Sequence, residues 1–326
     1  MTEKTAPRSA LGILATATAR HTPGRHTTGR HTTGRHTTGR DATGQGDEAP
    51  LPRLPGFVES SFSPLAYEVG SRCLTRQPGD GSRTAVALAS LMGDTTTADL
   101  ASRRVISGQV HNPLLFMQAT ANSILGYLSR EFGITGQTFS LSTLDDPLAE
   151  LLAMADLLLE DPGLDRVLVL GVELGAQAGG ASGGDPGGDS GGGRGGAAVP
   201  RERVAAAYRE LAADSGRPTP PPSAHADLAA AALLGRAGTG APVSVRPAEP
   251  HATDATAAAG HPGSLRGLFD LAGAHRRLLR DGGGHRLVTD PAAGRGPTAF
   301  LLTTDTKAPM PNAPAGRNET RTHAHQ

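Results

Sequence analysis

Two acidic residues, one cysteine and a histidine tract are the side chains of this sequence whose types and spacing suggest chemistry. Asp145 and Asp146 stand together before a proline, where a carboxylate can act as an acid, a base or a helix cap. Cys73 is the single cysteine, and a thiolate is a nucleophile. The tract His21–His36 repeats a histidine every five residues, a pattern that can bind transition metals.

The surroundings of Cys73 predict a structural role for it. Leu65, Val69 and Cys73 are spaced four apart in 63–76, which places them on one face of a predicted helix. A free cysteine on an apolar face usually packs as a small hydrophobic residue. We therefore expect Cys73 in the core and not as a nucleophile.

The histidine tract belongs to a five-residue repeat over 20–44. A period of five matches neither a helix nor a strand, and each unit contains glycine. We interpret 20–56 as a disordered insertion with a Pro-rich linker. The sequence leaves open whether the histidines bind metal or only reflect repeat expansion. We expect no cofactor.

The remaining sequence alternates strands with helices, which predicts an α/β fold. Helices are expected at 63–76, 95–104, 113–131, 147–160, 201–214 and 264–280, and strands at 84–92, 138–143, 166–174, 227–235, 242–247 and 297–304. Asp146-Pro147 is a typical helix start, with the carboxylate as cap. The expected organisation is a first strand in 1–19, the insertion at 20–56, a core at 57–174, a disordered Gly-rich loop at 175–200, a second part at 201–305 and a disordered tail at 306–326.

The apolar run 10–19 allows two interpretations. It follows basic residues and ends in small residues, as a signal peptide does, but it is short and interrupted by threonine. A first buried strand suits the α/β pattern better.

Composition narrows the function classes. Lysine plus arginine and aspartate plus glutamate number 31 each, so net charge predicts neither nucleic-acid nor membrane binding. One cysteine cannot form an internal disulfide, which fits a reducing, cytoplasmic setting. No apolar run is long enough to span a membrane.

Residues 112–175 resemble the N-terminal half of β-ketoacyl synthases in the thiolase superfamily. Within FMQATANSILGYLSREFGITGQTFSLSTLDD, Asn122 falls on the family's asparagine, and Ser142 and Thr143 fall on its Ser-Thr before the nucleophilic cysteine. Gly126, Gly133 and Gly136 match its glycines, and Glu173 matches its Gly-Gly-x-Glu. The resemblance implies a thiolase-like fold of essentially one βαβαβαββ half, a mixed sheet with helices on both faces, plus a reduced C-terminal remnant.

The resemblance also implies a substrate pocket near Asn122, Ser142, Thr143 and Asp145. Asp145 stands in the place of the family's cysteine, and a carboxylate at a helix N-terminus is a poor acyl acceptor. Only one of the family's two active-site histidines has a counterpart here, and that counterpart, His261, matches the family's motif weakly. No catalytic residue is therefore assigned.

The implied function is that of a degenerate synthase-like protein in fatty-acid or polyketide-type biosynthesis. As in chain-length factors, it would pair with a catalytically active β-ketoacyl synthase and serve an acyl carrier protein, as a homo- or heterodimer. Two alternatives stay open: an acyltransferase or malonyl-decarboxylating enzyme using the same pocket, and an acyl-binding module.

Overall fold

A computed structural model of the chain describes residues 7–22, 51–108, 114–142, 146–175, 226–249, 264–289 and 297–304, with isolated positions 206, 210 and 213. The strands are β1 (Leu11–His21), β2 (Thr84–Ala89), β3 (Thr138–Leu141), β4 (Arg166–Glu173), β5 (Asp227–Arg236), β6 (Val243–Ala248), β7 (Gly284–Thr289) and β8 (Thr298–Thr304). The helices are α1 (Phe62–Arg76), α2 (Thr95–Ile106), α3 (Leu114–Gln118), α4 (Ala121–Phe132), α5 (Pro147–Leu158) and α7 (Arg266–Asp281). Most residues of the segments predicted to be disordered, including most of the histidine tract, lie outside these ranges. The end of the predicted Pro-rich linker, 51–56, is an exception, because it is described and its Leu54 is buried.

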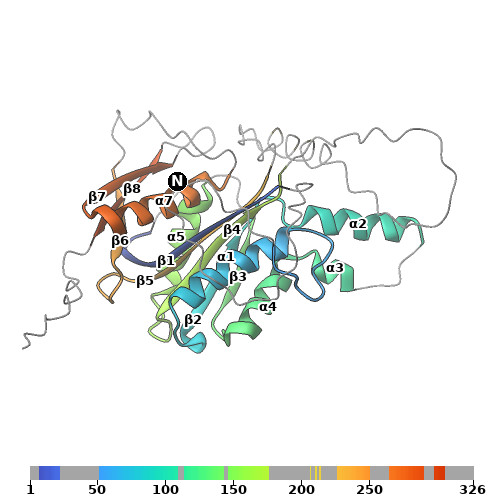
Figure 1. Cartoon of the computed structure of the whole chain (residues 1–326), viewed down its shortest axis with the longest axis horizontal. Helices are drawn as coiled ribbons and strands as arrows, with labels where there is room; N and C mark the ends of the chain where they lie inside the picture. Colours follow the sequence, from blue (N-terminus) through green and yellow to red (C-terminus); the bar gives the residue numbers. More distant parts are fainter. Residues whose placement is uncertain are drawn as a thin grey trace, which may run out of the picture.

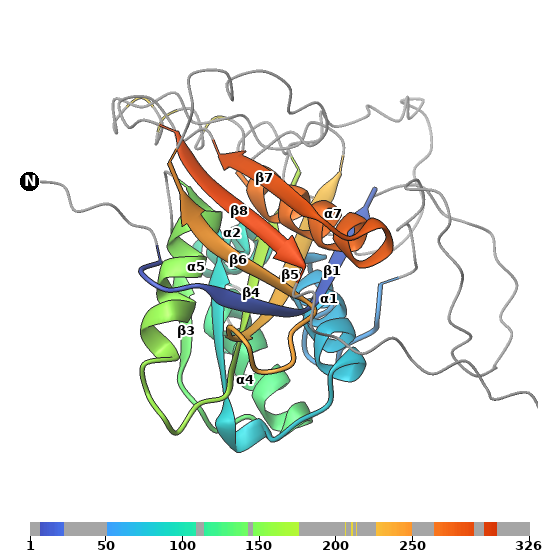
Figure 2. The ribbon, with the colours of Figure 1, turned by 90° about the vertical axis from the view of Figure 1, so that its left-hand side faces the viewer.

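The strands form one mixed sheet in the order β3-β2-β4-β5-β1-β6-β8-β7. β2 pairs in parallel with β3 and β4, and every later pairing is antiparallel. The strands that follow β5 lie together at one end of the molecule beside α7 (Figures 1 and 2). The predicted α/β class with a mixed sheet is therefore confirmed.

Two apolar layers hold helices on both faces of the sheet. β2 and β4 are buried along their whole lengths, because side chains that alternate along a strand meet helices on either face. One layer joins the sheet to α1 and α4, and the other joins it to α5 and α7. Cys73 lies in the first layer and is fully buried, as the sequence predicts.

The N-terminal apolar run is a strand of the sheet interior. β1 pairs with β5 over its full length and with β6 near Leu11–Ile13. Gly12 lets β1 pass close to Ala241, which lies just before β6, since a Cβ on Gly12 would lie 2.5 Å from the Cβ of Ala241. The strand interpretation of 10–19 is confirmed. No helix within the described ranges is long and apolar enough to cross a bilayer.

The helix predicted over 113–131 is wrong in its continuity, because the chain forms α3 and α4 instead. Thr120 adopts an extended conformation between them, and its hydroxyl donates to the carbonyl of Met117 at 2.8 Å. Threonine side chains that bond to the backbone compete with helix formation. At its other end, α4 stops as predicted at Gly133, whose φ of 63° is left-handed.

Strand β7 has no counterpart among the predicted elements. It begins at the last of three consecutive glycines and carries few apolar residues, so its pattern does not stand out from a loop. It forms because it pairs with β8 over six residues and Leu287 packs in the second apolar layer. The helix predicted at 201–214 lies almost wholly outside the described residues.

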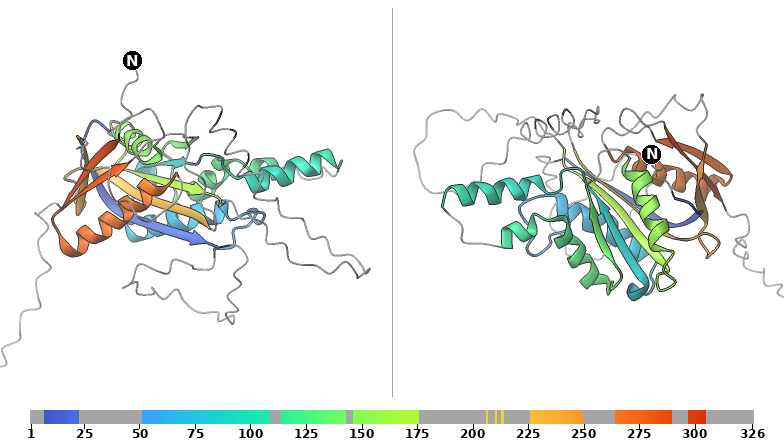
Figure 3. Two further views of the ribbon diagram at one scale, coloured as in Figure 1. Left: turned by 90° about the horizontal axis from the view of Figure 1, so that it is seen from above. Right: turned by 180° about the vertical axis from the view of Figure 1, so that it is seen from behind.

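Helices α2 and α3 form an arm that extends away from the sheet (Figures 1 and 3). Only Thr97 and Ala101 of α2 are buried. Apolar side chains of the arm are exposed instead, including Ile106 at 86% and Met117 at 62%. An exposed apolar cluster of this kind is typical of a surface that binds a partner.

Candidate functional site

The candidate site is the connection between a strand and a helix that the resemblance singles out. β3 ends at Leu141 and α5 begins at Pro147, so 142–146 join a strand to a helix N-terminus. Of the predicted site residues, Thr143, Asp145 and His261 lie outside the described residues. Ser142 and Asp146 lie on either side of that gap, and both are described.

Asp146 is the cap of α5. Its Oδ1 accepts the backbone N–H of Ala149 at 3.1 Å, and Pro147 occupies the first helical turn. Its Oδ2 accepts the hydroxyl of Thr289, the last residue of β7. Asp146 is buried, so both oxygens are committed to structural hydrogen bonds.

Ser142 attaches the start of the same connection to the neighbouring strand. Its hydroxyl donates to the carbonyl of Leu91, just beyond β2, at 2.9 Å. The backbone N–H of Ser90 donates to the carbonyl of Leu141 at 3.0 Å, which extends the pairing of β2 and β3. Ser142 itself is exposed.

A second carboxylate at these strand ends is also used structurally. Glu173 ends β4, and its Oε2 accepts both the N–H of Ser264 at 2.9 Å and its hydroxyl at 2.7 Å. Ser264 leads into α7, so Glu173 ties the end of a strand to the start of a helix. Glu173 is buried. The arrangement holds the start of α7 against the sheet.

Gly171 lets α7 approach β4 closely. A Cβ at this position would lie 2.5 Å from Cδ2 of Leu265 and 2.7 Å from Cδ1 of Leu268. The first turn of α7 thus occupies the space in front of β4, close to the end of the sheet where Glu173 lies.

Two more buried carboxylates lie near the same end of the sheet, and the adjacent serines before α1 hold both. Ser60 Oγ donates to Asp94 Oδ2 at 2.7 Å, and Ser61 Oγ donates to Asp227 Oδ2 at 2.5 Å. Gly175 N–H donates to Asp227 Oδ1 at 2.8 Å. The dipeptide therefore joins α1, the arm and β5.

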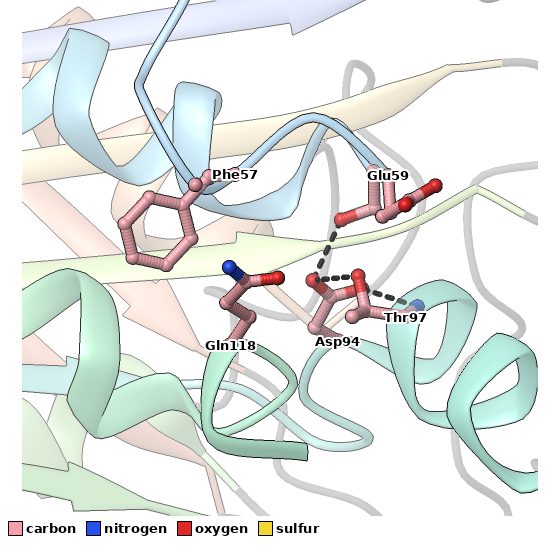
Figure 4. Close-up of a pocket in the computed structure, with 7 residues that line it drawn as sticks. Phe57, Glu59, Asp94, Thr97 and Gln118 are labelled. Atoms are coloured by element: carbon pink, nitrogen blue, oxygen red, sulfur yellow. Dashed lines mark hydrogen bonds between the residues drawn. The ribbon is translucent and has the colours of Figure 1, made fainter. Parts of the chain in front are cut away.

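Asp94 also caps α2 by accepting the N–H and the hydroxyl of Thr97 (Figure 4). Burial raises the pKa of Asp94, its hydrogen bonds oppose that shift, and the charge of Asp227 adds to it. Gln118 and Phe57 line the hollow beside this carboxylate, which is too narrow to admit a water molecule. We therefore interpret it as packing and not as a substrate pocket.

Asn122 lies in the first turn of α4, and its side chain is exposed. Asn122 therefore lies on the helix between the arm and the sheet, because α4 contacts both α3 and β3. Its predicted place in a substrate pocket stays a prediction.

The thiol of Cys73 is not activated as a nucleophile. Burial raises the pKa of its thiol to about 12, so it stays protonated at neutral pH. It lies on α1, on the other face of the sheet from α5. Among the described residues, no group of three or more histidine, cysteine or acidic side chains is placed to hold a metal ion.

Sequence reasoning missed Thr289 and Ser264 as partners of the site's carboxylates. Thr289 lies 143 positions from Asp146, and Ser264 lies 91 positions from Glu173. Neither residue belongs to a local motif, so only the fold brings them to the site.

Comparison with known proteins finds likenesses among solved structures alone. No family model matches the chain, and no curated protein matches its sequence. A ketosynthase in complex with its chain length factor from Xenorhabdus doucetiae is 17% identical, covers 78% of this chain and 82% of its own, and has a TM-score of 0.45. The ishigamide ketosynthase/chain length factor is 13% identical, covers 78% and 88%, and has a TM-score of 0.48.

A third similar structure is a type II polyketide synthase acyl-carrier protein in complex with its ketosynthase bound to the hexaketide. It is 11% identical, covers 77% of this chain and 85% of its own, and has a TM-score of 0.48. Because all three TM-scores lie below 0.5, we take the likeness as a description of shape only.

Proposed function

We propose that this chain is a non-condensing, ketosynthase-like subunit, similar to a chain length factor, in fatty-acid or polyketide-type biosynthesis. It pairs with a catalytically active β-ketoacyl synthase, and the pair uses substrates carried by an acyl carrier protein.

The observation that carries the proposal is the structural use of the strand-to-helix connection. Asp146 caps α5 and holds Thr289, while Glu173 holds Ser264. Covalent acyl transfer needs an activated nucleophile, and the sequence's single cysteine is buried elsewhere with a pKa of about 12. The described carboxylates at this end of the sheet therefore hold the fold together, which supports a role for the chain that does not include condensation.

The edge of the sheet at β3 is the proposed partner surface. β3 pairs with β2 on one side, and no other described strand pairs with its outer side. Phe139 is 37% exposed there, and the neighbouring residues Thr138 and Ser140 are exposed as well. An unpaired strand edge offers backbone donors and acceptors to a second chain.

The arm extends this surface with apolar side chains. Phe116 and Met117 of α3 are exposed, as are Val105 and Ile106 at the end of α2. α3 contacts α4, and α4 contacts β3, so the arm and the edge are joined through one helix. A continuous strip of strand edge and apolar helix suits a stable protein interface.

Co-purification tests the proposal. The chain is co-expressed with the β-ketoacyl synthase encoded nearest to it, and the mass of the eluted species is measured by light scattering. We expect one copy of each chain, and loss of the complex in Phe139→Asp. Leu157→Asp is the matched control, since Leu157 is an exposed leucine on α5.

Two outcomes would overturn this function. Failure to bind any synthase or carrier protein removes the partner role. Turnover of malonyl- or acyl-carrier-protein thioesters by the chain alone, lost in Asp145→Ala, would instead support the enzyme alternative.

A further inference from the structure

Four arginines lie near the C-terminal ends of α1 and α7, which pack against β1 from opposite faces of the sheet. Arg76 lies in the last turn of α1, and Arg280 lies in the last turn of α7. Arg276 and Arg277 precede Arg280 by one turn. All four side chains are exposed. We call Arg76, Arg276, Arg277 and Arg280 the arginine strip.

Contacts with β1 bring these two helices, which cover opposite faces of the sheet, to the part of the strand beyond its pairing with β6. Arg76 Nη1 donates to the carbonyl of Thr16 at 2.8 Å, and Thr16 Oγ1 lies 3.0 Å from Nδ1 of His275 on α7. After burial, the charges of Arg276 and Arg76 both lower the pKa of His275, so both guanidinium groups lie near the same ring. Arg76 of α1 and Arg276 of α7 therefore approach the same part of β1 from the two helices.

In the described part of the chain, direct ion pairs do not neutralise the positive charge of the strip, although the charge of Asp270 acts on His285, which Arg277 contacts. No carboxylate in the described part of the chain forms an ion pair with any of the four arginines, whereas Arg72 pairs with Glu68 at 2.7 Å. Arg277 instead contacts Nε2 of His285 at 3.1 Å. Asp281 is the one acidic residue adjacent to the strip in sequence. In a chain with equal numbers of acidic and basic residues, this is a concentration of charge.

The geometry favours a broad acidic occupant over a small anion or an added strand. Two helix C-termini converge here, and their partial negative charge disfavours a small anion in line with the helices. Arginine side chains already occupy the carbonyls of Thr16 and Thr18, which blocks strand addition at that edge. Leu279, 53% exposed between the arginines, adds apolar contact area.

We propose that the arginine strip is a docking surface for a partner protein with an acidic face. It is distinct from the proposed interface at β3. Four strand spacings separate β1 from β3, which is about 19 Å across the sheet. The two surfaces can therefore be tested independently.

Fluorescence anisotropy with a labelled decaglutamate peptide tests this inference on the full chain. We expect binding at low salt that weakens as salt screens the charges, and at least tenfold weaker binding in the double variant Arg276→Glu/Arg280→Glu. The matched control is Arg130→Glu, an exposed arginine on α4 over the ring of Tyr127. Phe139→Asp should bind the peptide like wild type even if it abolishes pairing with a synthase.

Several results would overturn the inference. They are absence of peptide binding at low salt, an equal loss in Arg130→Glu, or tighter binding to a 20-nucleotide DNA or to vesicles of 3:1 phosphatidylcholine and phosphatidylglycerol. Because arginines in a last helical turn also stabilise the helix, circular dichroism must show that the double variant is folded. If it is not, Arg276→Gln/Arg280→Gln replaces it, with the same expected loss of binding.

Discussion

The acidic side chains at the two ends of the parallel strands differ in their burial and in their hydrogen-bond partners. At the carboxyl ends, Asp94, Asp146 and Glu173 are buried and accept hydrogen bonds from hydroxyl and backbone N–H groups. At the amino ends, Asp165 is exposed and accepts a bidentate pair of hydrogen bonds from Arg83 at 2.5 and 2.7 Å. The pKa of Asp94 is raised by burial, whereas hydrogen bonds to Arg83 lower that of Asp165.

This contrast shows what each end of the sheet does. The carboxylate at the amino ends lies on the surface, and exposed ion pairs of that kind contribute little to stability. Carboxylates at the carboxyl ends join strands to helices that come from distant parts of the chain. The carboxyl end of the sheet is therefore a structural junction between strands and helices.

The largest expected effect is the loss of the Asp146 junction. Asp146→Ala removes the cap of α5, leaves the Ala149 N–H without its partner, and leaves the Thr289 hydroxyl with only the carbonyl of Thr298 at 3.2 Å. The cap is worth about 1 kcal/mol, and unsatisfied buried groups add about 2 kcal/mol, so we expect a loss of about 3 kcal/mol. Urea unfolding of this variant measures it.

Asp165→Ala is the control for that prediction, because it removes an exposed carboxylate from the opposite end of the same strands. A loss of stability in Asp165→Ala as large as in Asp146→Ala would contradict the contrast between the two ends.

Burial without a counter-charge also makes His275 sensitive to acid. Burial lowers its pKa to about 4, so the native state binds fewer protons than the unfolded chain below pH 6.5. Its contribution is fully present above pH 6.5 and is lost as pH falls through about 4, a change of roughly 3 kcal/mol. Unfolding free energies between pH 7 and 4 should show this slope, and His275→Gln should flatten it. An unchanged slope in the variant would show that other groups cause it.

The contact of α7 with β4 should tolerate no side chain at Gly171. Gly171→Ala forces Leu265 and Leu268 to move, and overpacking of this kind costs about 2 kcal/mol. Gly126→Ala is the control, because a Cβ there meets no atom within 4 Å and alanine favours a helix. Thermal melting that ranks Gly126→Ala below Gly171→Ala would refute this packing.

The smallest effects distinguish Asp94 from Asp165 by the sign of their pH dependence. The raised pKa of Asp94 means that its contribution is present below the ordinary aspartate pKa and is lost as pH rises through the folded pKa. The lowered pKa of Asp165 gives a contribution that is present above its ordinary pKa and is lost as pH falls. Melting temperatures of Asp94→Asn and Asp165→Asn from pH 3 to 7 should deviate from wild type with opposite slopes. Slopes of the same sign would contradict the assigned environments.

Local signals predicted much of this fold. Asp146-Pro147 gave the start of α5, Gly133 the end of α4, and the apolar runs gave β2, β4 and β5. The break between α3 and α4 was missed because it depends on one threonine hydroxyl, and β7 was missed because pairing with β8 creates it.

Only the carboxylates of the candidate site could be predicted from the sequence, because their partners depend on contacts between distant segments. Its carboxylates stand in recognisable sequence positions, but their partners Thr289 and Ser264 come from segments without a motif. The arginine strip likewise arises only when α1 and α7 meet at β1.

Intact-protein mass spectrometry after incubation with malonyl- and acyl-carrier-protein thioesters tests the central claim most directly. We expect an unmodified chain and no 3-oxoacyl product unless an active synthase is added. A chain that gains the mass of an acyl group on the peptide containing 141–147 would contradict it.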